Sequence, residues 1–241
     1  MPKSIAVFGA GPGLGQAVAR RYAREGYEVV LVARRRAPLE TLARQLGAAG
    51  ATTHIVTADL AVTEAIPALA DQVRAAVGDP DALYYAPTSE GGFIPAAELT
   101  PRRAGEFMPL AVYSLLALVQ QFLPHMLGQG DGAILTAQGG STVHGLANLS
   151  GPGPAQAAQR NYLQSLQAEV TDRGVYVGML YIGAIIEHSA FHVEAERAAA
   201  SGTGRYWGPT VAPALLADLL WEMHANKQPA EVIYPQPGFR P

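Results

Sequence analysis

The chain lacks cysteine altogether, and among its 241 residues it has two lysines, Lys3 and Lys227, one close to each end. Without cysteine it forms no disulfide, no thiolate metal site and no cysteine nucleophile. Charged residues make up 15% of the composition and the formal net charge is -3, which argues against a nucleic-acid partner. The first apolar run starts at Ile5 and leaves no room for a signal peptide, so we expect a cytoplasmic location.

Long hydrophobic runs are also absent. The most apolar stretch covers residues 110–119, which is too short to span a bilayer and contains Tyr113 and Ser114. We therefore expect a buried helix there and no membrane partner. A hydrophobic content of 49% over 241 residues is sufficient for one large core.

Strand and helix patterns alternate along the chain. We expect strands over residues 5–8, 28–33, 53–57, 82–86, 133–137, 175–182 and 231–234. We expect helices over residues 16–25, 39–46, 63–77, 103–127 with an interruption near Pro109, 154–172 and 211–226. This order predicts an α/β fold: a single Rossmann-like domain over residues 1–241, with a doubly wound parallel sheet and helices on both faces.

A glycine-rich loop joins the first strand to the first helix. Glycine permits the tight turn and lets a pyrophosphate approach the N–H groups at the start of the helix. The spacing is Gly-x-x-x-Gly-x-Gly rather than the usual dinucleotide fingerprint, and the alternative interpretation is a plain strand-to-helix turn. We expect the cofactor to contact Gly9, Gly11, Pro12, Gly13, Leu14 and Gly15.

An arginine cluster follows the second strand, about twenty residues beyond the glycines. A carboxylate at this place would accept hydrogen bonds from an adenosine ribose, whereas arginine favours a 2′-phosphate. Arg34 and Arg35 therefore predict NADP(H) as the cofactor, and Arg36 is expected to be solvated. The alternative is a solvated basic turn that opens the next helix.

These features resemble the short-chain dehydrogenase/reductase family over nearly the whole chain. The resemblance rests on the spacing of Gly9, Gly13 and Gly15, and on Ile182-Gly183 where the family has Pro-Gly. It implies a small-molecule substrate, a homo-oligomer (dimer or tetramer), and a substrate lid over residues 186–208. Further cofactor contacts that it implies are Asp59, Leu60, Ala86, Gln156, Gly183 and Ile185.

The resemblance also implies an active site that this chain does not carry. In the family a Tyr supplies a proton, a Ser holds the substrate oxygen, a Lys lowers the Tyr pKa and an Asn assists. Counting along the matched helices places these four roles on Pro152, Gly139, Gln156 and Ala111. No Tyr-x-x-x-Lys occurs anywhere in the sequence, and Tyr162 lies ten residues too late.

Several substitutes for the missing groups remain open. Ser141 is a candidate for holding a substrate oxygen, and His144 is a candidate proton donor. Tyr84 or Tyr85 is a third possibility, and Gln156 can bind a ribose hydroxyl without carrying a charge. Residues 151–154 read Gly-Pro-Gly-Pro, which is either a repositioned helix start without chemistry or a backbone oxyanion site.

The predicted lid contains a pair of histidines, His188 and His192, four residues apart. This spacing suits a metal on one helical face, but no third ligand is evident, so we expect no metal. Phe191, Tyr206 and Trp207 are candidate apolar walls for a substrate.

Three functions follow. The first is an NADP(H)-dependent oxidoreductase with an unconventional proton donor, or one whose substrate needs little protonic help, such as an activated alkene or iminium. The second is a non-redox enzyme on the same scaffold. The third is an NADP(H)-binding sensor or partner protein without catalysis, and fold analogy alone does not decide between them.

Overall fold

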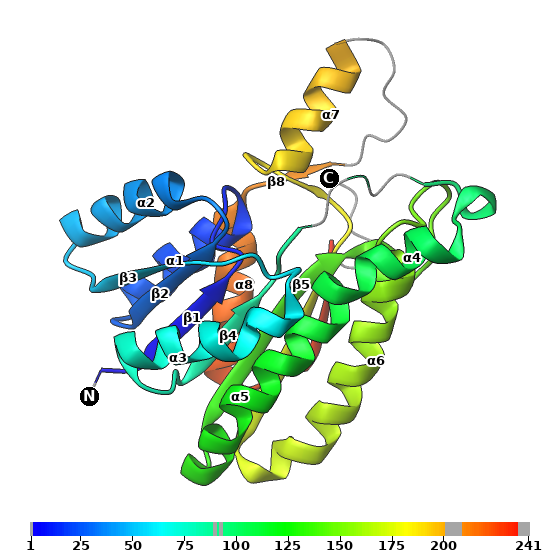
Figure 1. The fold of residues 1–241 in the computed structure, drawn as a ribbon. Helices are drawn as coiled ribbons and strands as arrows, with labels where there is room; N and C mark the ends of the chain where they lie inside the picture. The colour runs from blue at the N-terminus through cyan, green and yellow to red at the C-terminus, as the bar shows by residue number, and fades with distance from the viewer. Residues whose placement is uncertain (1, 89–90, 92–93, 201–208, 236–241) are drawn as a thin grey trace.

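The structure, a computed structural model, describes residues 2–88, 91, 94–200 and 209–235. Seven parallel strands form one sheet in the order β3-β2-β1-β4-β5-β6-β9, which confirms the predicted Rossmann-like α/β fold (Figure 1). The strands are β1 Ser4–Phe8, β2 Glu28–Ala33, β3 Thr53–Thr57, β4 Ala82–Tyr85, β5 Gly132–Gly139, β6 Val175–Ile182 and β9 Glu231–Tyr234.

Helices cover both faces of this sheet. They are α1 Leu14–Arg24, α2 Arg36–Ala48, α3 Ile66–Val77, α4 Pro101–Met108, α5 Ser114–Gln129, α6 Gly153–Val170, α7 Ala190–Ala200 and α8 Pro213–Asn226. Helices α1, α2 and α8 contribute to one apolar cluster, and α3, α5 and α6 to the other. The order of strands reverses direction between β1 and β4, which is where ligands of open α/β sheets bind.

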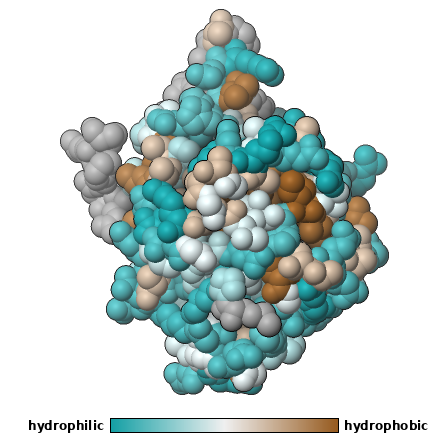
Figure 2. All heavy atoms as spheres, turned by 90° about the vertical axis from the view of Figure 1, so that its left-hand side faces the viewer, coloured by the Kyte–Doolittle hydropathy of each residue, from teal (hydrophilic) through white to brown (hydrophobic). Residues whose placement is uncertain are grey.

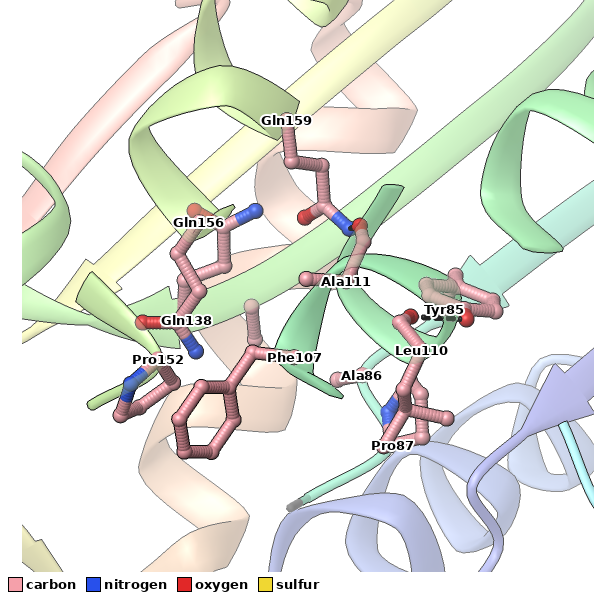
Figure 3. A pocket seen from close by; sticks show the side chains of 11 residues that line it. Tyr85, Ala86, Pro87, Phe107, Leu110, Ala111, Gln138, Pro152, Gln156 and Gln159 are labelled. Carbon is pink, nitrogen blue, oxygen red and sulfur yellow. Dashed lines mark hydrogen bonds between the residues drawn. The ribbon is translucent and has the colours of Figure 1, made fainter. Parts of the chain in front are cut away.

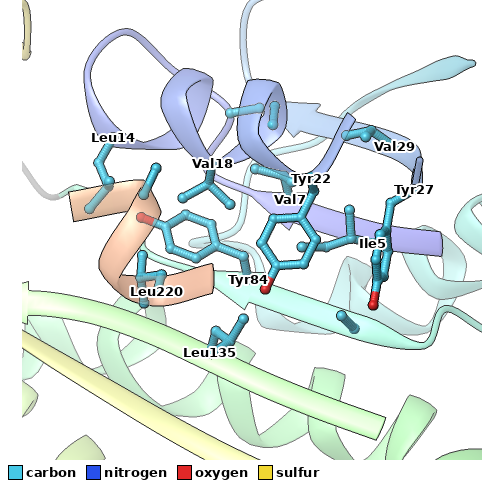
Figure 4. Packing of buried hydrophobic residues seen from close by; sticks show 14 of the residues in the cluster. Ile5, Val7, Leu14, Val18, Tyr22, Tyr27, Val29, Tyr84, Leu135 and Leu220 are labelled. Carbon is cyan, nitrogen blue, oxygen red and sulfur yellow. The ribbon is translucent and has the colours of Figure 1, made fainter. Parts of the chain in front are cut away.

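Strand residues alternate between the two clusters because successive side chains point to opposite faces. In β1, Ile5 and Val7 join the first cluster, whereas Ala6 and Phe8 join the second. Figure 4 shows the first cluster, with the Tyr84 ring beside Val18. The fully apolar strands are thus explained by burial on both sides.

The predicted lid region has more regular structure than its sequence indicated. Strand β7, Ile185–Ile186, pairs in parallel with β8, Thr210–Val211, and α7 lies between them in the sequence. Residue 211 therefore belongs to a strand, and the helix predicted from there begins at Pro213, as suits a proline. The candidate wall residues Tyr206 and Trp207 lie outside the described residues.

The helical stretch expected over residues 103–127 runs from Pro101 to Gln129 and includes the apolar run of residues 110–119. It spans 29 residues, and an 18-residue window within it has a mean hydropathy of 1.5, so by length and composition it could cross a membrane. Core helices of globular proteins pass the same test, and Leu118 and Phe122 are fully buried in the second cluster. Figure 2 shows a largely hydrophilic face of the molecule with small scattered apolar patches.

A buried tyrosine–histidine pair links α1 to α8. Burial raises the pKa of Tyr22, so its hydroxyl keeps its proton, and the hydroxyl oxygen forms a hydrogen bond with Nδ1 of His224 at 2.8 Å. The two rings stack with centroids 5.7 Å apart. Burial lowers the pKa of His224 from its ordinary 6.5 to about 4, so the imidazole is neutral at pH 7.

This pair predicts an acid-sensitive fold. The unfolded chain takes up a proton at His224 below about pH 6.5, whereas the folded protein does so only near its lowered pKa of about 4. Stability is therefore lost as the pH falls between these values, by about 2 kcal/mol from pH 7 to pH 5.

Urea unfolding at both pH values measures this loss. His224→Gln removes the titrating group and should abolish this part of the pH dependence, whereas His144→Gln, at an exposed position, should retain it. Equal acid sensitivity in His224→Gln and the unmodified protein would contradict the assignment.

Candidate active site

The glycine loop at the end of β1 has the geometry of a phosphate cradle. Gly9 and Gly13 adopt φ angles of +101° and +91°, which other residues rarely adopt. A Cβ on Gly15 would lie 2.0 Å from the Gly9 carbonyl oxygen, whereas a Cβ on Gly11 would meet nothing within 4 Å. The loop thus packs closely on its inner side and leaves open space at Gly11, before the first N–H groups of α1.

The loop is tied to the strand that carries the arginine cluster. The N–H groups of Gly9 and Ala10 both donate to the carbonyl of Val32 in β2, at 3.0 Å each. Arg34 and Arg35 follow at the exposed end of this strand, next to the loop. Arg36 pairs with Glu40 at 2.8 Å and begins α2, so its guanidinium is engaged locally.

Three further predicted cofactor residues follow the ends of neighbouring strands. Asp59 is exposed and its Oδ1 accepts from the N–H of Ala61 at 3.0 Å. Leu60 is buried, and Ala86 directly follows β4, where its N–H donates to the carbonyl of Phe8 at 3.2 Å. These positions flank the glycine loop on the same edge of the sheet.

The segment after β6 approaches the loop from the other side. Gly183 donates to the carbonyl of Tyr234 at 2.6 Å, and Ile185 is buried in β7. A Cβ on Gly13 would lie 3.2 Å from the side chain of Ser189, which directly precedes α7. The base of the predicted lid therefore lies beside the glycine loop.

A recess opens at the carboxyl ends of β4 and β5, beside α4 and α6 (Figure 3). It brings together three of the four positions to which the sequence assigned the family's catalytic roles, Ala111, Pro152 and Gln156. Its lining residues are Tyr85, Ala86, Pro87, Phe107, Leu110, Ala111, Ala137, Gln138, Pro152, Gln156 and Gln159.

The fourth position, Gly139, lies at the end of β5 and has a hydroxyl next to it. A Cβ on Gly139 would lie 3.5 Å from Oγ of Ser141 and 4.0 Å from Oε1 of Gln156. The Ser141 hydroxyl therefore stands close to where a serine side chain at position 139 would begin. Thr142 donates to Oε1 of Gln156 at 3.3 Å, which leaves the Gln156 Nε2 as the end that can donate to a ligand.

A π-helical turn, Pro109–Tyr113, explains the interruption predicted near Pro109. Its carbonyls are held by side chains from other elements: Leu110 accepts from the Tyr85 hydroxyl, and Ala111 accepts from Nε2 of Gln159. Single π turns are frequent at functional sites. Here the turn fixes one wall of the recess.

Sequence reasoning did not assign six of the recess residues to the site: Pro87, Phe107, Leu110, Ala137, Gln138 and Gln159. Phe107 and Gln159 lie on helices whose apolar and polar patterns are ordinary, and Gln138 lies inside a buried strand. The strand predicted from the sequence ended at residue 137, so the sequence did not indicate that Gln138 lies in β5.

The alternative proton donors lie elsewhere or are engaged. Tyr84 points into the opposite cluster, Tyr162 packs at the edge of the second cluster, and His144 is exposed outside the recess lining. Tyr85 lines the recess, but burial raises its pKa and its hydroxyl already donates to Leu110.

Both lysines are also remote from the recess. The Nζ atoms of Lys3 and Lys227 lie 3.1 and 2.7 Å from the carboxylate of Asp131. Asp131 directly precedes β5, so it lies at the amino ends of the strands, whereas the recess lies at their carboxyl ends. Hydrogen bonds from these two lysines lower the pKa of Asp131 to about 2. No lysine is therefore placed to bind a nicotinamide ribose.

Two other candidate sites have a defined geometry. The Gly-Pro-Gly-Pro segment begins α6 at Gly153, and Pro154 has no N–H, so a backbone oxyanion site would rest on the N–H groups of Gly153 and Ala155. The His188 N–H donates to Nδ1 of His192 at 3.3 Å. Within the described part of the chain, no group of three His, Asp or Glu side chains suits a metal ion.

Comparison with known proteins assigns the family. Residues 3–196 match the short chain dehydrogenase family model. An uncharacterised oxidoreductase of Mycobacterium tuberculosis is 31% identical over 189 residues, covering 76% of this chain and 70% of that protein. The chain therefore belongs to the short-chain dehydrogenase family. A fatty acyl-CoA reductase of the same species is 30% identical, covering 74% of this chain and 62% of its own length.

Solved structures show the same fold over nearly the whole chain. L-Sorbose reductase from Gluconobacter frateurii, complexed with NADPH and L-sorbose, superposes with a TM-score of 0.84 at 23% identity, covering 96% of this chain and 94% of its own. A short-chain oxidoreductase from Pseudomonas aeruginosa, described as containing an atypical catalytic center, superposes with a TM-score of 0.80 at 19% identity, covering 99% and 98%.

The loop geometry predicts different losses of stability when Gly15 and Gly11 are each replaced by alanine. Gly15→Ala forces a methyl group against the Gly9 carbonyl and should lower the free energy of unfolding by about 3 kcal/mol or more, whereas Gly11→Ala should change it by less than about 0.5 kcal/mol. Thermal or urea unfolding of both variants measures the difference. Equal losses would mean that the loop does not pack as described.

Proposed function

We propose that this protein is an NADP(H)-dependent oxidoreductase that acts on a small molecule without a tyrosine–lysine proton donor. One observation carries the proposal. The positions to which the sequence assigned the family's Tyr, Lys and Asn converge on one recess as Pro152, Gln156 and Ala111. The pocket is thus retained, while the groups that move a proton are replaced by neutral ones.

The cofactor assignment rests on the glycine loop and the cluster beside it. Gly11 faces open space suited to a pyrophosphate, and the exposed Arg34 and Arg35 are placed for a 2′-phosphate. The structural neighbours with NADPH or 5-hydroxy-NADP bound support the same choice. Gly183 and Ile185 would lie on the nicotinamide side.

The bound nicotinamide would supply or accept a hydride. The hydroxyl of Ser141 and the side-chain amide of Gln156 lie near position 139, and we propose that they orient a substrate oxygen there. Neither group titrates near neutral pH, so neither delivers a proton as a tyrosine–lysine pair does. We therefore propose a substrate that needs little protonic help, such as an activated alkene or an iminium.

A second function is favoured by the same neutral lining. Without a proton donor, the chain would serve equally as an NADP(H)-binding sensor or partner subunit that catalyses no reaction. The Pseudomonas neighbour with an atypical catalytic center supports the view that this fold carries altered sites. A non-redox reaction in the recess is the third possibility.

Two measurements separate the oxidoreductase from the non-catalytic protein. Quenching or enhancement of nicotinamide fluorescence reports binding of NADPH and NADH. Consumption of NADPH with enones and cyclic iminium ions, but not with simple ketones, supports the oxidoreductase. Binding without consumption of any of them supports the non-catalytic protein, and an absence of NADPH binding contradicts both.

Arginine substitution tests the 2′-phosphate assignment. Arg34→Ala should weaken NADPH binding by about 10-fold to 100-fold, because a charge-assisted hydrogen bond to the phosphate is lost, and should leave NADH binding within about twofold. Arg36→Ala is the matched control, since Arg36 is paired with Glu40 and should leave both affinities unchanged. Equal losses of NADPH and NADH affinity in Arg34→Ala would contradict the assignment.

Four further features belong to the proposal. We propose a single domain over residues 1–241, a substrate lid over residues 186–208, a cytoplasmic location and a homo-oligomer. The exposed ring of Tyr113 on the apolar helical stretch supports pairing of copies, because 48% of its surface remains accessible.

A further inference from the structure

One side chain in the recess has its hydrogen-bonding capacity unused. Gln138 lies in β5, it is 7% exposed, and it lines the recess. Neither its Nε2 nor its Oε1 finds a hydrogen-bond partner among the described residues. Buried polar groups are satisfied in the great majority of cases, so this amide requires an explanation.

The neighbouring glutamines are not in this state. Gln159 donates to the carbonyl of Ala111, and Gln156 accepts from Thr142. The same recess therefore contains two amides that are fixed by the protein and one, Gln138, that is not. Leaving a buried amide unpaired costs free energy, which a ligand recovers when it pairs with the amide.

The surroundings of Gln138 define the ligand further. Tyr85 has the one ionisable side chain among the described lining residues, and its hydroxyl is engaged. Phe107 and Pro152 lie beside Gln138 in Figure 3 and supply apolar surface. A charged ligand would find no counter-charge among these residues, so of the two proposed substrate types the recess favours the neutral activated alkene over the iminium ion.

We propose that Gln138 is a specificity-determining residue that binds the amide edge of a neutral activated alkene, an unsaturated lactam or an unsaturated cyclic imide. A carboxamide presents one acceptor and one donor side by side. A cis-amide edge presents the complementary pair, so two parallel hydrogen bonds satisfy both atoms of Gln138 at once. This inference rests on the proposed function in placing the substrate in the recess.

The carboxamide group of the nicotinamide also presents a donor and an acceptor side by side, so the cofactor is an alternative hydrogen-bond partner for Gln138. The recess lining shares Ala86 and Gln156 with the predicted cofactor contacts but includes neither the glycine loop nor Gly183 and Ile185. The substrate is the partner that we propose for Gln138, and substitution of Gln138 tests this choice. If the substrate is the partner, substitution of Gln138 changes the affinity for the lactam; if the nicotinamide is the partner, the substitution changes the affinity for NADPH.

Three six-membered probes test the proposal: δ-valerolactam, N-methyl-δ-valerolactam and cyclohexanone. Ligand-observed NMR titration is performed with the full chain, with and without NADPH. We expect δ-valerolactam to bind about tenfold more tightly than the other two, because they lack the N–H donor. Gln138→Leu should abolish this preference, whereas Gln129→Leu, an exposed control at the end of α5, should retain it.

A stability measurement separates ligand recognition from a structural role. Gln138→Leu removes two unpaired polar atoms from a buried place and should raise the unfolding temperature, whereas loss of a structural hydrogen bond would lower it. A lower unfolding temperature overturns the proposal.

Three other results also overturn it: equal or undetectable binding of the three probes, a lactam preference that survives Gln138→Leu, or a loss of NADPH affinity in that variant. NADPH binding by the unmodified protein is recorded separately. Its absence contradicts the proposed cofactor, while the lactam preference is still read from the titration without NADPH.

Discussion

The contact between Gly15 and the carbonyl of Gly9 is the constraint on which the rest of the site depends. Because no side chain separates them, α1 begins directly above the end of β1, and the loop between them is held with Gly11 facing open space. The same placement brings Tyr22 of α1 against His224 of α8. One close approach of backbone thus fixes both the phosphate cradle and the packing of a sheet face.

The neutral recess is the second feature that defines this member of the family. Its walls come from β4, β5, α4, α6 and the π turn, and the turn is held by the hydroxyl of Tyr85 and the amide of Gln159. Three glutamines line it, and both lysines of the chain are bound to Asp131 at the amino ends of the strands. We therefore propose that the protein combines the cofactor scaffold of its family with a pocket that recognises its ligand by hydrogen bonds rather than by charge.

Most of the fold was predictable from the sequence, because buried parallel strands leave continuous apolar runs such as residues 175–182, and prolines and glycines mark the turns. The two-residue strands β7 and β8 were not, since a pairing across more than twenty residues leaves no local pattern. Spacing located the glycine loop and the positions of Pro152 and Gln156. It did not reveal the role of Gln138, which depends on what surrounds its amide in three dimensions.

The central claim is that no group in the recess delivers a proton during hydride transfer. Its most direct test is the rate of NADPH oxidation by a cyclic enone between pH 6 and pH 9, under conditions that saturate the cofactor. The account predicts a rate that varies by less than about twofold, because no described lining side chain titrates in this range. A rate that falls about tenfold or more around a single pKa in that interval would contradict it.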